Sequence, residues 1–138
     1  MKAHLQFRLF ILAVLSIGVY SFAHEGHDHA PGHGAPHGGV VKEGKNFDLE
    51  LVTQGQEIRL YPLDKKGQSI LAQNLVISAT AQPPKQAKAD LRLVAEKEYF
   101  TAKADPKGSY RFELSVTATY QKQKNEFRFQ VETESIAD

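Results

Sequence analysis

The sequence contains no cysteine and no tryptophan, and its single methionine is Met1. Without cysteine, no disulfide stabilises the fold, so a hydrophobic core has to do so. Beyond Met1 the chain also offers neither a thiolate nor a thioether, which are the soft ligands that favour Cu(I). Metal chemistry in this chain must therefore rest on imidazole, carboxylate, amine and backbone groups.

The chain also lacks an apolar run long enough to span a membrane. Its longest run, residues 9–19, has 11 residues, whereas a spanning helix needs roughly 20. The run follows the basic residues Lys2 and Arg8 and precedes Ser21-Phe22-Ala23, which has small residues at the positions that a signal peptidase reads. This pattern predicts a signal peptide over residues 1–23 rather than a membrane anchor. We therefore expect a periplasmic or secreted protein without stable membrane insertion after cleavage.

A strong net charge is absent as well. The chain has 17 basic and 16 acidic residues, and removal of Lys2 and Arg8 with the signal peptide leaves a net charge of −1. A nearly neutral protein is a poor match for nucleic acid or an anionic membrane as partner.

Residues 24–39 differ in composition from the rest of the chain. Five of these 16 residues are histidine, five are glycine and two are proline, and no large apolar residue is present. Such a segment cannot bury enough surface to offset its chain entropy, so we expect a disordered tail over residues 24–38. Short histidine-rich tracts are typical of metal binding, and imidazole suits divalent ions such as Zn²⁺, Cu²⁺, Ni²⁺ and Co²⁺.

The candidate metal ligands of the tail are its imidazoles: His24, His27, His29, His33 and His37. One residue separates His27 from His29, so a flexible chain can bring both onto one ion. Ordering the tail costs entropy, which predicts moderate affinity and favours a buffer or capture arm over a catalytic centre. The alternative is a hydrophilic linker that happens to contain histidine.

Cleavage after Ala23 would make His24 the first residue of the mature chain. Its α-amine and imidazole could then chelate one Cu²⁺ together, because an α-amine with a pKa near 8 loses its proton readily to a competing metal. The alternative is that His24 is merely the first residue of the tail.

From Val40 onward, apolar and polar residues alternate in short segments, such as 47–51, 110–120 and 127–131, with turn signals between them. Seven to eight such strands predict an antiparallel, immunoglobulin-like β-sandwich over residues 39–133, followed by a C-terminal tail over 134–138. Tyr110 and Tyr120 fall on the apolar phase of their strand, which places them in the core.

A second candidate metal site lies where the tail meets the sheet. A hairpin around residues 43–46 that sets Gly39 opposite Glu50 would place His37, Asp48 and Glu50 on one face. One imidazole and two carboxylates make a partial site for a borderline metal. The alternative is an ordinary solvated strand face, and a slip of one residue in register would move the acids to the other face.

The stretches 35–41, 46–52 and 58–64 resemble a small periplasmic module. This module occurs alone or near the N-terminus of adaptor subunits of heavy-metal efflux pumps of the resistance-nodulation-division type. Its pattern is a Pro-His-Gly-Gly turn followed by an aromatic-x-x-Glu-Leu-Val strand, matched here by His37, Gly38, Gly39 and Glu50, while Asp48 stands where the family often has histidine. The resemblance implies periplasmic handling of zinc, cobalt, nickel or copper, with a metal-efflux complex as partner.

These observations together predict a binding protein for divalent transition metals that sequesters the ion or delivers it to an efflux system. An enzyme is not expected, because the sequence has neither a nucleophile-elbow motif nor a phosphate-binding glycine motif. Two alternatives stay open. The domain could bind a protein partner or be structural, with the histidine-rich segment as a linker, or the protein could be a secreted copper enzyme that uses His24.

Overall fold

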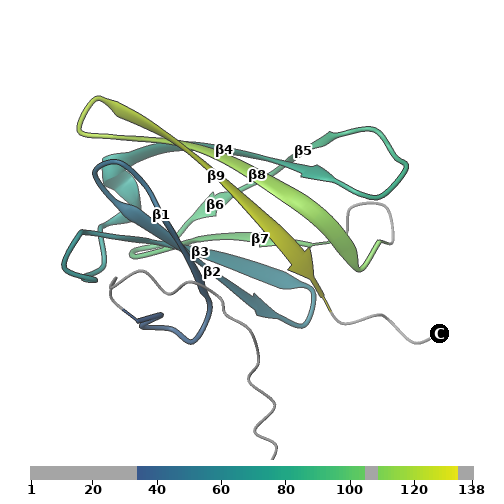
Figure 1. Cartoon of the computed structure of the whole chain (residues 1–138), viewed down its shortest axis with the longest axis horizontal. Helices are drawn as coiled ribbons and strands as arrows, with labels where there is room; N and C mark the ends of the chain where they lie inside the picture. The colour runs from purple at the N-terminus through teal and green to yellow at the C-terminus, as the bar shows by residue number, and fades with distance from the viewer. Residues whose placement is uncertain (1–33, 105–108, 134–138) are drawn as a thin grey trace, which may run out of the picture. The chain divides into compact units, whose positions relative to one another are not determined.

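The computed structural model describes residues 34–104 and 109–133, and this part of the chain consists almost entirely of β-strands. The strands form two antiparallel sheets that lie one above the other in Figure 1, with the order β1-β2-β3-β7-β6 in the first and β5-β4-β8-β9 in the second. The predicted antiparallel β-sandwich is therefore confirmed. The predicted signal peptide, residues 24–33 of the predicted tail and the C-terminal tail lie outside the described residues.

The first sheet contains β1 (Val40–Glu43), β2 (Asp48–Gln54), β3 (Glu57–Leu63), β6 (Val94–Ala95) and β7 (Phe100–Lys103). The second sheet contains β4 (Leu75–Gln82), β5 (Ala89–Leu91), β8 (Arg111–Tyr120) and β9 (Gln123–Glu132). A short 3₁₀ helix, η1 (Ala72–Asn74), leads into β4. Among residues 34–104 and 109–133, no helix has the length and hydropathy of a membrane span.

The structure describes nine strands where the sequence predicted seven or eight. The additional strand arises because the chain changes sheets after Leu91. β5 pairs with β4 in the second sheet, and β6, three residues later, pairs with β7 in the first. Alternation has the same period in both sheets, so it gives no sign of this change.

The core lies between the two sheets and is built from the alternating apolar residues of the long strands. β8 and β9 supply Phe112, Leu114, Val116, Ala118, Phe127, Phe129 and Val131, and the first sheet supplies Phe47, Leu49, Leu51, Ile58 and Leu60. Tyr120 packs against this core, as predicted. Tyr110 is 50% exposed, so its prediction as a core residue is wrong; it precedes the first residue of β8 and is outside the strand's alternation.

The turn between β1 and β2 is joined to the turn between β8 and β9 by a pair of asparagines. The buried Asn125 side chain donates to Asn46 Oδ1 over 2.8 Å and accepts from the N–H of Lys45 over 2.6 Å, while Asn46 Nδ2 donates to the carbonyl of Tyr120 over 2.9 Å. Gly44 allows this approach, because a Cβ there would lie 2.7 Å from Asn125 Oδ1. These bonds hold the two sheets together at the end where β2 begins.

Candidate functional site

The candidate site is centred on Glu50, a carboxylate in the middle of β2 with no exposed surface. Burying a carboxylate is costly unless hydrogen bonds replace its water. Its Oε1 accepts from the backbone N–H groups of His37 and Gly39, both over 2.9 Å. Its Oε2 lies 2.8 Å from His37 Nδ1. All three of these partners belong to the segment that precedes β1, so one side chain holds this segment on the sheet.

Two glycines allow the segment to fold back in this way. A turn forms as the N–H of Gly38 donates to the carbonyl of Ala35 over 3.1 Å, and Gly38 has a φ of +77°, where a side chain would be strained. Gly39 lies so close to β2 that a Cβ there would be 2.1 Å from the carbonyl oxygen of Leu51. The Pro-His-Gly-Gly sequence therefore has a local structural reason: it brings the His37 side chain and two backbone donors onto Glu50.

The imidazole of His37 contacts the aromatic ring of Tyr61 as well as the carboxylate of Glu50. It stacks on Tyr61 of β3 with a centroid distance of 3.8 Å and an interplanar angle of 12°. Tyr61 is the cross-strand partner of Glu50, and it in turn contacts Tyr99 at 5.1 Å between centroids. The His37 side chain keeps 31% of its surface exposed. It is thus fixed at one face and one edge while part of the ring stays open to solvent.

The hydrogen bond to Glu50 sets the proton position on the His37 ring. An ionised carboxylate only accepts, so Nδ1 is the nitrogen that carries the proton in the neutral ring. Nε2 then has its lone pair free, and no described residue forms a hydrogen bond with it. A neutral imidazole with Nδ1–H bound and Nε2 unprotonated is the form that coordinates a metal ion through Nε2.

The predicted register of the β1–β2 hairpin is wrong. The sequence set Gly39 opposite Glu50, whereas the structure pairs Val41 with Glu50 and Glu43 with Asp48. The hairpin is displaced by one residue on each strand, which leaves the alternation of faces unchanged. His37 and Glu50 meet as the sequence predicted, but through the turn before β1 rather than through a strand pair.

Asp48 is brought to a different partner. It is 5% exposed, and its Oδ1 lies 2.5 Å from Lys65 Nζ and accepts from the N–H of Gly44 over 3.2 Å. The three predicted sheet ligands therefore divide into the pair His37–Glu50 and the ion pair Asp48–Lys65. In the part of the chain that the structure describes, no group of three or more histidine, aspartate or glutamate side chains is placed to hold a metal ion. His24, His27, His29 and His33 lie outside that part.

Sequence reasoning did not single out Tyr61 or Lys65. The partner of Glu50 could have been found from a tight turn at Gly55–Gln56, since a two-residue loop there pairs Gln54 with Glu57 and so sets Glu50 opposite Tyr61. Lys65 gives no comparable signal, because it lies in the loop after β3 and reaches Asp48 only in the folded structure.

Comparison with known proteins gives one distant structural likeness. No protein-family model matches the chain, and no curated protein matches it significantly. Its structure is similar to that of a DUF4426 family protein from Pseudomonas aeruginosa, with 14% identity, a TM-score of 0.46, and coverage of 70% of this chain and 99% of the other. A likeness at this level says nothing about function.

Proposed function

We propose that this protein binds divalent transition metal ions through the histidine-rich segment 24–37, in the periplasm or outside the cell. The observation that carries the proposal is the contact between His37 and the buried carboxylate of Glu50. The five imidazoles within 14 residues supply the ligands. Delivery of the bound ion to an efflux system rests on the resemblance of residues 35–64 to the adaptor module and is part of the same proposal.

The His37–Glu50 pair has the form of a ligand with its support. Histidines that bind metals commonly donate their second ring N–H to a carboxylate, which fixes the tautomer and raises the basicity of the ligating nitrogen. Glu50 does this at Nδ1, and Tyr61 holds the plane of the ring. Glu50 orients the ligand and is not itself a ligand, because both of its oxygens already accept hydrogen bonds and its side chain has no exposed surface.

One imidazole alone holds an ion weakly, so the remaining ligands have to come from elsewhere in the segment. His33 precedes His37 by four residues, and His24, His27 and His29 follow the predicted cleavage point. The lack of cysteine and of methionine beyond Met1 favours Zn²⁺, Cu²⁺, Ni²⁺ and Co²⁺ over Cu(I). We expect an affinity suited to buffering or capture.

Calorimetric titration of residues 24–138 with Zn²⁺, Cu²⁺ and Ni²⁺ tests the proposal. At least one of these ions should bind with a Kd of roughly 10 μM or tighter, about −7 kcal/mol. A variant with His24, His27, His29 and His33 replaced by alanine should lose most of this affinity, and His37→Ala should weaken it further. As a control, Gln130→Ala on the far edge strand β9 should bind like the unchanged protein. Binding no tighter than millimolar for every ion would refute the proposal.

A further inference from the structure

One strand of the second sheet has an unpaired edge. β4 pairs with β8 along its whole length, from Leu75 to Gln82, but it pairs with β5 only over Ala79–Ala81. Across residues 34–104 and 109–133, no strand lies against Leu75–Ser78 on the side away from β8. This open half of β4 has no part in the proposed metal site, which is on the other sheet.

The backbone of Ile77 points its hydrogen-bonding groups to the open side. The N–H of Leu75 donates to the carbonyl of Ala72 in η1, so Leu75 directs its N–H away from β8. In an antiparallel ladder, alternate residues direct both groups to the same side, so Ile77 directs its N–H and C=O to the open side too. No backbone or side-chain partner for these two groups is present in the described chain.

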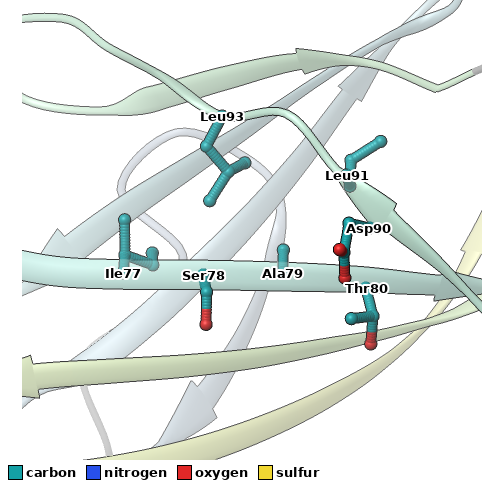
Figure 2. A pocket seen from close by; sticks show the side chains of 7 residues that line it. All are labelled: Ile77, Ser78, Ala79, Thr80, Asp90, Leu91 and Leu93. Atoms are coloured by element: carbon teal, nitrogen blue, oxygen red, sulfur yellow. The ribbon is translucent and has the colours of Figure 1, made fainter.

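An opening lined by both apolar and polar residues adjoins this edge. It has a volume of about 330 Å³ and is lined by Ile77, Ser78, Ala79, Thr80, Asp90, Leu91 and Leu93. Figure 2 shows the side chains of Ile77 and Leu93 facing each other across it, with Leu93 on the segment that leaves the sheet after β5. On the outer face of the same edge, Val76 is 78% exposed. Each face of the open edge therefore presents an aliphatic side chain, Ile77 on the inner face and Val76 on the outer face, where the polar Ser78 is also exposed.

The edge lacks the charged residues and prolines that often protect an exposed strand from pairing. Exposed edge strands normally contain lysine, proline or a bulge that prevents another strand from adding. Residues 68–82 contain no charged residue and no proline. The one charged residue that lines the opening is Asp90, at its β5 end.

We propose that the open half of β4 binds an extended segment of a partner polypeptide, which adds as a strand beside Leu75–Ser78. The added strand exchanges both backbone hydrogen bonds with Ile77 and inserts an aliphatic side chain between Ile77 and Leu93. Its next side chain packs beside Val76, and a basic residue at its end pairs with Asp90. A small apolar molecule matches this edge less well, because it would leave the N–H and C=O of Ile77 unpaired.

The test uses a capped heptapeptide, Lys-Thr-Val-Thr-Val-Thr-Lys, added to ¹⁵N-labelled protein spanning residues 24–138. Saturable shifts of the amide signals of Leu75–Ser78 are expected. The same peptide N-methylated at alternate residues, which cannot form the ladder, should bind at least about tenfold more weakly. Val76→Lys should weaken binding about fivefold. Val94→Lys, at an exposed valine of β6, is the matched control and should bind like the unchanged protein.

Several results would overturn this proposal. They are the absence of saturable shifts at millimolar peptide, equal binding of the N-methylated peptide, and an equal loss of binding in the two valine variants.

Sedimentation equilibrium provides a further check. If the protein forms a dimer that Val76→Lys dissociates, the edge is occupied by a second copy and not by a partner strand. Thermal unfolding verifies that both variants are folded. Metal binding plays no part in the readout, so failure of the proposed function leaves this test intact.

Discussion

Glu50 attaches the segment before β1 to the sheet. Its side chain is buried, and in the described structure all of the carboxylate's hydrogen bonds come from residues 37–39. Sequence reasoning placed Glu50 on a solvated or metal-binding face, because acids that alternate with leucines usually face water. It is buried because the Pro36–Gly39 turn covers this face of β2. Alternation predicted that His37 and Glu50 lie on the same face, whereas their contact and the burial of Glu50 depend on a fold-back that alternation does not encode.

The substitution Glu50→Gln separates the orienting role of this side chain from its role in packing. The amide oxygen can still accept from the backbone N–H groups, but the amide nitrogen facing His37 is a donor. His37 should therefore move its proton from Nδ1 to Nε2, so that Nδ1 can accept. The protonated Nε2 is then no longer a ready ligand, and metal affinity should fall about tenfold to 100-fold.

Imidazole ¹⁵N chemical shifts report the tautomer of His37, and calorimetry reports the affinity. Glu126→Gln, at an exposed acid of β9, is the control and should change neither quantity. A change of tautomer without loss of affinity would show that His37 is not a ligand. Retention of Nδ1–H in Glu50→Gln would show that Glu50 does not set the tautomer.

At the scale of elements, the hairpins show that alternation predicts the buried face of a strand but not its register. For the alternating segments 47–51, 112–120 and 127–131 the inward faces were predicted correctly, because period-two alternation determines which side is buried. The predicted β1–β2 register was wrong because alternation cannot detect this displacement. Each strand moves by one residue relative to the prediction, and the same side chains stay on the same faces. The actual register depends on the bonds of Lys45 and Asn46 to Asn125, 80 and 79 residues away, which a local pattern cannot contain.

The β8–β9 hairpin closes with a two-residue turn of unusual composition. Gln121 and Lys122 have φ values of 49° and 65°, the left-handed region that asparagine and glycine occupy most readily. Replacement of this pair by Asn-Gly should raise the free energy of unfolding by about 1 kcal/mol, since left-handed conformations of ordinary residues cost roughly 1–2 kcal/mol. Thermal unfolding should show an increase in Tm of about 4–8 °C.

Gly55, in the turn between β2 and β3, provides a control in which a left-handed glycine is replaced and stability should fall. It has a φ of +58°, and a Cβ there would meet no atom within 4 Å, so only its backbone conformation is tested. Gly55→Ala should lower the free energy of unfolding by about 1 kcal/mol. An unchanged or lower Tm for the Asn-Gly variant would contradict this account of the β8–β9 turn.

At the scale of the whole molecule, the proposed metal site joins a histidine-rich segment to a folded domain. The imidazoles of residues 24–33 are present in the unfolded chain as well, so metal binding to them alone does not favour the folded state. A ligand stabilises a protein only through its preference for the folded form. The His37–Glu50 contact exists only in the folded structure, because it joins residues 13 apart across a strand and a turn. Its participation in metal binding should therefore appear as an increase in stability.

Thermal unfolding of residues 24–138 with and without Zn²⁺ measures this coupling. If orientation by Glu50 makes the folded chain bind tenfold more tightly than the unfolded chain, saturating metal should raise the free energy of unfolding by about 1.4 kcal/mol. His37→Ala should abolish the increase while the histidines of residues 24–33 still bind the ion. An increase of equal size in His37→Ala would place the folded-state ligand elsewhere. Binding without any increase in the unchanged protein would show that the domain carries the metal-binding segment without contributing a ligand to it.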